Sequence, residues 1–290
     1  MHTMFGLTGT IAISASEYPS MTFAAVRASE ALGQITPVWL EPDHGRITPS
    51  VLKSQLTRDV TAVGVSLVDF RTGFLADLEG IRQVIGDRIL IVDAMQGFGV
   101  VDAPFTLADV VVSGGQKWVR AGWGTAFLAM SDRAAEQLVP VFSGYTATAE
   151  PGLPLDGVVP PRNGVGAFQV TNEDPIAQAR LAVALEEIRE VGVDVINADI
   201  AGRVTRLIEL ADEYGVPVTS PRELPERAGI VVLEPPADHL TVLTASLFNH
   251  GVSTTTREGR VRLSAHVSTT DETFEMVRAS FVAYASAIQV

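Results

Sequence analysis

Short apolar runs alternate with longer amphipathic stretches over the first 130 residues of the chain. Two of the longer stretches have helical periodicity and end at a glycine, 21–33 and 74–86. Regular alternation of strands and helices predicts right-handed crossovers and therefore an α/β fold, in which helices flank a mainly parallel sheet. The runs of strand length, rich in β-branched residues, are 10–14, 35–40, 61–68, 88–93, 109–113 and 124–130.

The pattern changes in the second half of the chain. Residues 143–171 are rich in glycine, proline and polar residues, which is typical of a loop that crosses the surface between two lobes. A long helix is expected from near Asn172 to Gly192, with Glu173, Asp174 and Pro175 in its first turn. A second helix is expected over 193–214. We therefore predict a large domain over 1–171, and an interdomain helix with a small C-terminal domain over 172–290.

The small domain is expected to be α+β. Strands are predicted at 215–220 and 229–235, a helix at 239–251, and a hairpin that turns at Glu258–Gly259. Thr269 and Glu272 have the spacing of a capping box, which indicates the start of a last helix.

Polar groups follow two neighbouring apolar runs. Asp93 and Gln96 follow the run 88–93, and Lys117 follows 109–113. In an open parallel sheet, such strand ends face the ligand crevice. An acid and a lysine there suit pyridoxal phosphate, because the lysine can form a Schiff base and the acid can pair with the pyridine nitrogen. The same residues also have an ordinary interpretation, since an Asp at a strand end is often a cap and a lysine after two glycines is often solvated.

Composition narrows the function further. The chain has 290 residues, a formal net charge of −13 and no basic run, which argues against nucleic acid and anionic membranes as partners. It has no cysteine, so disulfides, thiolate metal ligands and a thiol nucleophile are excluded. The five histidines lack metal-ligand spacing, so no metal is expected. No signal-peptide pattern or membrane-length apolar run is present, and we expect a cytoplasmic protein.

Four segments, in this order, resemble the class V aminotransferase family, which belongs to the fold-type-I pyridoxal-phosphate enzymes together with kynureninases and cysteine desulfurases. The similarity runs from about Ile11 to the C-terminus. It implies the large cofactor-binding domain of fold type I, a smaller C-terminal domain, pyridoxal 5'-phosphate as cofactor and a homodimer. The segments are SEYPSMTFA, VDAMQGFGVVD, GGQKWVRAGWGTAFL and GRVRLSAHVSTTDETFEMV.

The resemblance also implies roles for single residues. Lys117 matches the Schiff-base lysine and Asp93 the partner of the pyridine nitrogen. Gln96 matches a His or Gln near the ring hydroxyl, where an amide can donate to the oxygen; its ordinary alternative is a surface amide. Tyr18 matches the aromatic or His that stacks on the ring, and otherwise is a half-buried tyrosine.

Two further groups are implied in the same way. Ser113, Gly114 and Gln116 flank the lysine, where small residues let the backbone approach the cofactor phosphate. Arg262 matches the arginine that binds the substrate α-carboxylate, because a planar guanidinium holds two oxygens in parallel; the alternative is a solvent-facing hairpin arginine. By the two-residue period of a strand, Arg260 shares the face of Arg262.

The chain departs from the family pattern in two ways. Without a cysteine it is not a desulfurase with a catalytic thiol, so transamination, elimination or lyase chemistry, and racemisation stay open. The chain also begins shortly before the SEYPS segment, so the family's N-terminal strand, Gly-Thr loop and phosphate-binding helix are expected to be missing. Gly6, Thr8, Gly9 and Thr10 precede a strand rather than a helix and do not replace them.

We therefore expect a pyridoxal-phosphate-dependent enzyme that acts on a small amino acid, aminotransferase-like or a lyase, with Lys117 as the base once it is displaced. The alternative is a truncated or degenerate non-catalytic relative that serves as a dimerisation or regulatory partner. A generic nucleotide-binding protein fits less well, because no GxGxxG or Walker pattern follows a strand.

Overall fold

The computed structural model describes residues 2–150, 152 and 156–288. The chain forms two compact units. The first contains Met1–Leu67, Ala76–Phe98 and Ala103–Glu187, and the second contains Val68–Leu75, Gly99–Asp102 and Ile188–Val290. The predicted boundary between residues 171 and 172 stays a prediction.

The first unit is built on a six-stranded sheet of order β2-β1-β3-β4-β5-β6. All neighbouring strands are parallel except β5 and β6, which are antiparallel. The prediction of an α/β fold with a mainly parallel sheet is confirmed. The strands are β1 (Gly9–Ser14), β2 (Ile35–Leu40), β3 (Val60–Ser66), β4 (Ile89–Asp93), β5 (Val110–Gly114) and β6 (Ala126–Met130).

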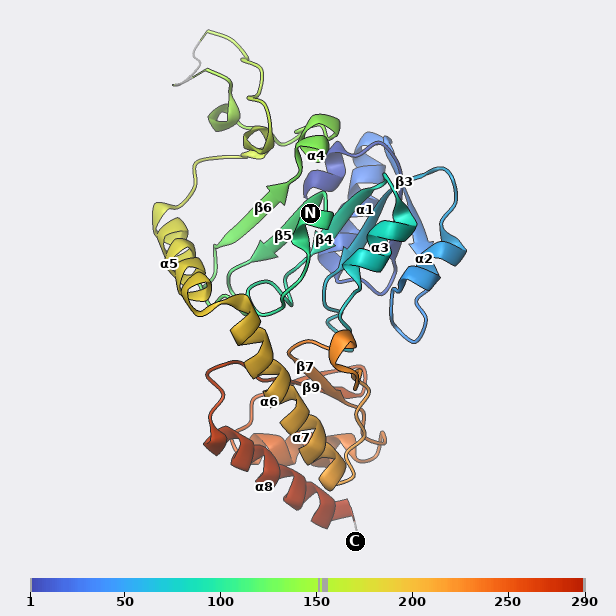
Figure 1. Ribbon diagram of the computed structural model, residues 1–290, viewed down its shortest axis with the longest axis vertical. Coiled ribbons are helices and arrows are strands. Elements are labelled where there is room, and N and C mark those ends of the chain that lie inside the picture. The colour runs from blue at the N-terminus through green and yellow to red at the C-terminus, as the bar shows by residue number, and fades with distance from the viewer. Residues whose placement is uncertain (1, 151, 153–155, 289–290) are drawn as a thin grey trace. The chain divides into compact units, whose positions relative to one another are not determined.

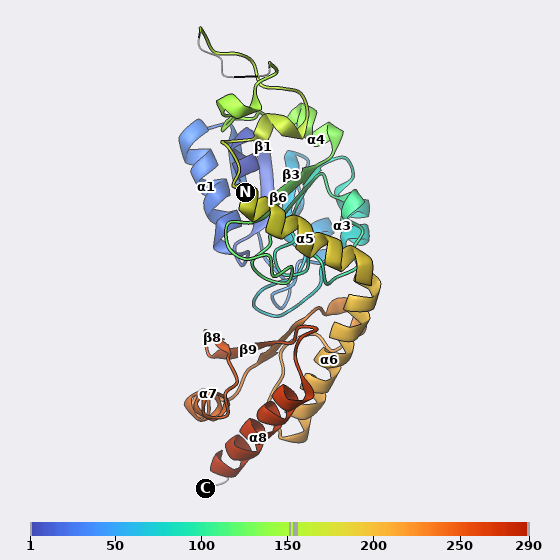
Figure 2. The same ribbon diagram turned by 90° about the vertical axis from the view of Figure 1, so that its left-hand side faces the viewer.

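Helices cover both faces of this sheet. Figure 2 shows the helices α1 and α3 on opposite faces of the sheet. This is expected, because the chain adds β2 on one side of β1 and the later strands on the other side (Figure 1). The helices of the unit are α1 (Pro19–Leu32), α2 (Pro49–Gln55), α3 (Leu78–Ile85), α4 (Asp132–Gln137) and α5 (Pro175–Val191), with α5 continuing into the second unit. Single 3₁₀ turns lie at His2–Gly6, Phe105–Leu107, Tyr145–Ala147 and Val165–Phe168.

The core of the first unit lies between the central strands and α1. Ile11 and Ile13 of β1, Ile91 of β4 and Met21 of α1 are fully buried. Gly64 of β3 lies at their closest approach: a Cβ there would stand 2.8 Å from Ile13 Cγ2 and 3.1 Å from the Met21 sulfur. The glycine therefore allows α1 to pack directly on the sheet.

Capping residues correct two predicted helix starts. Asp77 accepts a hydrogen bond from the Gly80 N–H at 2.9 Å, so α3 begins at Leu78 rather than at residue 74. Asp174 accepts from the Ile176 N–H at 2.8 Å and caps α5, which begins at Pro175. The acidic residue at this end therefore precedes the helix instead of forming its first turn.

The second unit contains a three-stranded antiparallel sheet of order β7-β9-β8 and three helices. Glu258 and Gly259 have φ values of 51° and 79°, as a two-residue hairpin turn requires, and they join β8 to β9 as predicted. The elements are α6 (Val193–Glu213), a 3₁₀ turn at Leu224–Glu226, β7 (Ile230–Leu233), α7 (Leu240–Asn249), β8 (Thr255–Arg257), β9 (Arg260–Ser264) and α8 (Asp271–Ile288).

Two predictions for this unit were wrong. Residues 215–220 do not form a strand, because only Val218 makes a single bridge, to Leu233. The last helix is capped by Thr270, whose Oγ1 accepts from the Thr273 N–H at 3.3 Å. Thr269 instead accepts from the His266 N–H at 3.0 Å, so its hydroxyl closes the preceding loop.

Within the described residues, no helix is long and apolar enough to cross a membrane.

Candidate active site

Polar residues gather at the carboxyl edge of the large sheet. Asp93 is the last residue of β4, Ser66 ends β3 and Gly114 ends β5. Since these strands are parallel, their carboxyl ends lie along the same edge. Lys117 follows β5 by one tight turn, which is closed by a hydrogen bond from the Ala121 N–H to the Gly115 carbonyl at 2.7 Å. The strand order therefore delivers the predicted acid and lysine to one place.

Asp93 is a buried carboxylate. It is 7% exposed, and its Oδ1 accepts from the Met95 N–H at 2.9 Å. Burial raises its pKa, whereas the Met95 hydrogen bond and the positive charge of Lys117 lower it. The net pKa is raised, so the site does not fully compensate the ionised form. Such a carboxylate suits a cationic partner, for example a protonated ring nitrogen.

Lys117 lies against an aromatic ring. Its Nζ is 5.5 Å from the centroid of Tyr18, and the lysine is half-buried. Tyr18 occupies the N-cap position of α1, directly before Pro19, whose ring fixes the start of the helix. The structure thus brings together an amine, an aromatic ring and a buried acid, all within the first unit.

Two glycines allow the lysine turn to pack closely. A Cβ on Gly114 would clash with the Gln116 Oε1 atom, because the Gln116 side chain folds back over this residue. A Cβ on Gly115 would clash with the Thr125 hydroxyl and would stand 2.9 Å from Ala121 Cβ. Neither glycine has a positive φ, so close packing rather than backbone conformation requires them.

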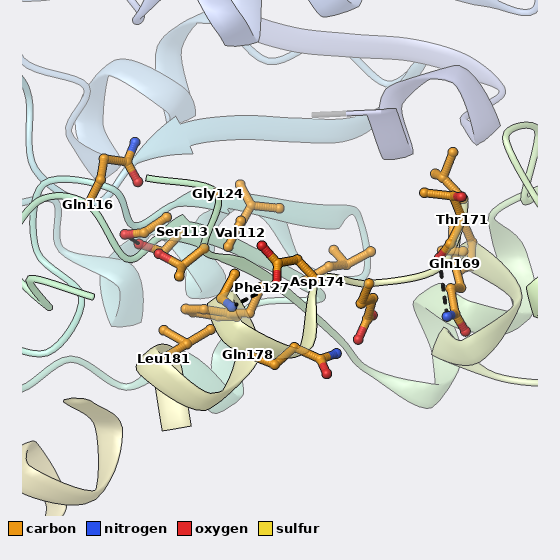
Figure 3. Close-up of a pocket in the computed structure, with 18 of the residues that line it drawn as sticks. Val112, Ser113, Gln116, Gly124, Phe127, Gln169, Thr171, Asp174, Gln178 and Leu181 are labelled. Atoms are coloured by element: carbon orange, nitrogen blue, oxygen red, sulfur yellow. Dashed lines mark hydrogen bonds between the residues drawn. The ribbon is translucent and has the colours of Figure 1, made fainter. Parts of the chain in front are cut away.

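A cavity of about 1140 Å³ lies beside this edge. Asp93, Ser113, Gly114 and Gln116 line it, and so do residues of β6 and α5. Figure 3 shows Ser113 and Gln116 on one side of the cavity and Gln169 and Thr171 on the other. Much of the remaining wall is apolar, including Met95, Val112, Phe127, Phe142, Phe168 and Leu181. A few polar groups in an apolar cleft are typical of a small-molecule site.

Three predicted residues of the first unit do not line this cavity. Gln96 is 7% exposed and sits in the turn after β4, and neither it nor Tyr18 nor Lys117 is among the described residues that line the cavity. Arg262 belongs to the second unit, on β9. Burial and then the charge of Arg257 lower its pKa. It is therefore a partly desolvated guanidinium, as expected for a group that binds a carboxylate.

Sequence reasoning missed Glu17. Its side chain is 8% exposed, its Oε1 accepts from the Ser66 N–H at 3.0 Å, and its Oε2 accepts from the Ser66 hydroxyl. The available signal was an acid placed between the end of a buried strand and Tyr18. A buried carboxylate at this position needs hydrogen-bond donors, and Ser66 supplies two.

The residues present fit the ring and the aldehyde of pyridoxal phosphate. A buried acid, an amine and an aromatic face are the protein groups that suit the ring and the aldehyde of this cofactor. The glycine and threonine residues near the start of the chain do not take part: Gly9 and Thr10 begin β1, at the opposite end of the strand from Ser14. The Gly9 N–H donates to the Gln34 carbonyl at 2.9 Å. Ser113 and Gln116 remain the predicted contacts for the phosphate.

Several solved structures share this fold at low sequence identity. A cysteine desulfurase from Thermococcus onnurineus NA1 in its apo form matches with a TM-score of 0.85 and 21% identity, over 99% of this chain and 76% of that one. The cystine C-S lyase C-DES, in complex with cysteine persulfide, has a TM-score of 0.82 and 19% identity, over 96% and 77%. An alanine–glyoxylate aminotransferase from Nostoc sp. has a TM-score of 0.71 and 17% identity, over 98% and 77%. No curated protein sequence matches the chain.

The model of the family described as aminotransferase class-V matches residues 2–290. A variant of C-DES holds glycine covalently linked to pyridoxal phosphate. The match confirms the resemblance carried by the four sequence segments and the cofactor that it implied. This chain therefore belongs to the class V aminotransferase family.

Proposed function

We propose that this protein is a pyridoxal-phosphate-dependent enzyme that transaminates a small amino acid, with Lys117 as the residue that holds the cofactor covalently. One observation carries the proposal: the Lys117 amine lies 5.5 Å from the Tyr18 ring centroid, and its charge acts on the buried Asp93 carboxylate. When bound, the cofactor supplies a ring that accepts electrons from the substrate carbon. The protein must position that ring and move one proton.

Each predicted side chain then has a physical task. Asp93 would keep the ring nitrogen of a bound cofactor protonated, and its raised pKa indicates that a cation would stabilise its ionised form. Tyr18 would cover one face of the ring, and Gln96 would donate to the ring oxygen. The Lys117 amine would hold the cofactor aldehyde and would also be the base that takes and returns the substrate proton.

Arg262 is proposed to bind the substrate α-carboxylate. The planar guanidinium can donate two parallel hydrogen bonds, and partial burial strengthens them because water competes less. Arg262 lies in the second unit and the cofactor residues in the first. We therefore base this assignment on the guanidinium group of Arg262 and on its partial burial within the second unit. We also propose that the enzyme is a homodimer.

The choice of transamination over lyase chemistry is testable. The structural relatives include a lyase and an aminotransferase, and the absence of cysteine excludes sulfur transfer to a protein thiol. An aminotransferase needs a 2-oxo acid acceptor for turnover, whereas a lyase releases its product without one. Turnover of an amino acid that continues without any acceptor would replace the aminotransferase by a lyase.

The chain offers a sharp test of the lysine, because it contains two lysines, Lys53 and Lys117. Lys53 is exposed on α2 and serves as a matched control. Added cofactor should give the absorption band of a lysine-bound aldehyde in the wild type and in Lys53→Ala, and no such band in Lys117→Ala. Borohydride reduction followed by peptide mass analysis should find the label on Lys117. A folded wild-type protein without a band would instead support the non-catalytic alternative.

A further inference from the structure

The β8–β9 hairpin carries three arginines on one face. Arg257 lies opposite Arg260 and Thr255 opposite Arg262 in the register of the two strands. Residues directly opposite each other share a face, and so do residues two apart along a strand. Arg257 and Arg262 are therefore diagonal neighbours, with backbones roughly 7–8 Å apart. Arg260 on the same face is paired with Glu234, at 3.0 Å.

The Arg257 side chain is positioned by an aromatic ring. Its guanidinium carbon lies 5.9 Å from the centroid of Phe70, and that of Arg71 lies 5.4 Å from the same centroid. Residues 68–75 belong to the same unit as the hairpin. Both guanidinium groups therefore lie within cation–π distance of the Phe70 ring, and Arg257 is also exposed to solvent.

The loop that carries Phe70 is itself fixed. The Asp69 Oδ1 atom accepts from the Arg71 N–H at 2.9 Å and from the N–H and hydroxyl of Thr72 at 2.7 Å each. The Ser220 hydroxyl donates to the Thr72 carbonyl at 2.6 Å. These hydrogen bonds fix the backbone of the loop that carries the Phe70 ring.

Charge at this place favours an anion. The chain as a whole carries a net charge of −13, yet here Arg257 and Arg71 lie near the same ring, and the charge of Arg257 lowers the pKa of Arg262. Two nearby acids are engaged: Asp69 accepts hydrogen bonds from its own loop, and Glu234 pairs with Arg260. Adjacent guanidinium groups repel each other, and a bound carboxylate would remove that repulsion.

We propose that Arg257 and Arg71 form a second anion-binding site beside Arg262, and that the substrate is therefore an amino acid or 2-oxo acid with a carboxylate on its side chain. The inference deepens the proposed function, because it takes Arg262 as the residue that binds the α-carboxylate. Arg262 then binds one carboxylate and Arg257 the other. Bidentate pairs at both ends would select dicarboxylates over alanine-like substrates.

The first test measures binding to the complete chain, with and without added pyridoxal phosphate. Titration calorimetry compares succinate, which has two carboxylates, with propionate, which has one. The wild type should bind succinate roughly tenfold to a hundredfold more tightly, as expected for one additional charge-assisted contact. In Arg257→Gln, the affinity for succinate should fall close to the affinity for propionate. Arg260→Gln is the matched control, because Arg260 lies on the same face but pairs with Glu234, and it should retain the preference.

The second test measures turnover. In Arg257→Gln, kcat/KM for glutamate or aspartate should fall roughly tenfold to a hundredfold, as in the binding test. For alanine, kcat/KM should stay within about twofold of the wild-type value. A wild type that binds succinate no better than propionate, or an Arg260→Gln variant that loses as much as Arg257→Gln, overturns the inference. Failure of the proposed function has a different signature: no cofactor band on Lys117, while the succinate preference of the protein persists.

Discussion

Glu17 and Ser66 join the loop that presents Tyr18 to the strand next to Asp93. The Glu17 carboxylate accepts from both the N–H and the hydroxyl of Ser66. Ser66 is paired in register with Asp93, and the Leu67 N–H donates to the Asp93 carbonyl at 2.8 Å. One buried contact therefore fixes the relative positions of the aromatic ring and the acid that the proposed function places around the cofactor.

Loss of this contact should weaken cofactor binding as well as the fold. Glu17→Ala leaves the partly buried Ser66 N–H without its acceptor, so we expect a loss of about 1–3 kcal/mol in the free energy of unfolding. The cofactor should also dissociate faster, because Tyr18 is no longer held. Glu17→Gln keeps an acceptor and should retain more of both properties. Urea unfolding and the rate of cofactor release measure the two effects.

A matched control separates positioning from general stability. Thr48 caps α2 by accepting from the Val51 N–H at 3.3 Å, so Thr48→Ala should cost about 1 kcal/mol of stability through a similar lost bond. The Thr48 hydroxyl bonds to Val51 and Ser50, neither of which is a predicted site residue, so the variant should leave cofactor release unchanged. Equal release rates in Thr48→Ala and Glu17→Ala would reduce Glu17 to a structural role.

The ionised Asp93 carboxylate should lower the free energy of unfolding of the cofactor-free protein. Burial raises its pKa above the ordinary value of 3.8, so the ionised form is disfavoured in the folded state. The resulting loss of stability is complete at pH values above the raised pKa of the folded state. It shrinks as the pH falls below that value, because the folded state then takes up the proton, and it is gone below the pKa of the unfolded state. Asp93→Asn should therefore raise the thermal midpoint of the cofactor-free protein at neutral pH, and this gain should shrink in acid.

The same variant should bind cofactor less well. Without the carboxylate, the ring nitrogen loses a charge-assisted partner, and affinity should fall by about tenfold to a hundredfold. Opposite effects on stability and affinity are the signature of a functional acid. If Asp93→Asn destabilises the cofactor-free protein at neutral pH, Asp93 is a structural cap instead.

Asp109 should show the reverse pH dependence. Burial raises its pKa, but hydrogen bonds from Arg133, the Leu90 N–H and Arg82 outweigh this, and the net pKa is lowered. Its contribution to stability is therefore present above the unfolded pKa and is lost as the pH falls through the lowered folded pKa. Asp109→Asn should cost about 3–5 kcal/mol at neutral pH, since it leaves two partly buried arginines without their anion. Urea unfolding at several pH values checks both signs.

The sequence predicted the scaffold well where the signal is local. All six strands of the large sheet coincide with apolar runs of strand length, and the central strand β4 is buried along its whole length, which leaves little choice of residue. The short helices α2 and α4 were not expected, since seven and six residues hold little periodicity. The cap of α8 was misplaced by one residue because Thr269 and Thr270 are chemically alike.

The candidate site likewise contains residues with a local sequence signal and residues without one. The position of Asp93 and Lys117 at the same edge of the sheet could be predicted, because Asp93 ends β4 and Lys117 lies three residues after β5; their roles stay predictions. Glu17 could not, since its partner lies 49 residues away in the sequence and a lone acid before a tyrosine carries no unique pattern. The contact between Phe70 and Arg257 is still more distant in sequence. It depends on a loop that belongs to the second unit although the strand before it belongs to the first.

The two glycines before Lys117 should differ in their tolerance of a methyl group. At Gly115 the added Cβ would meet Thr125, whose hydroxyl is held by the Gly122 carbonyl at 2.6 Å, and also Ala121. Since neither can move freely, Gly115→Ala should cost about 1–3 kcal/mol and displace the lysine turn. At Gly114 the Cβ would meet the ends of the flexible Gln116 and Met95 side chains, so Gly114→Ala should cost less. Urea unfolding ranks the two variants, and a larger loss in Gly114→Ala would mean that the Gln116 side chain is itself held in place.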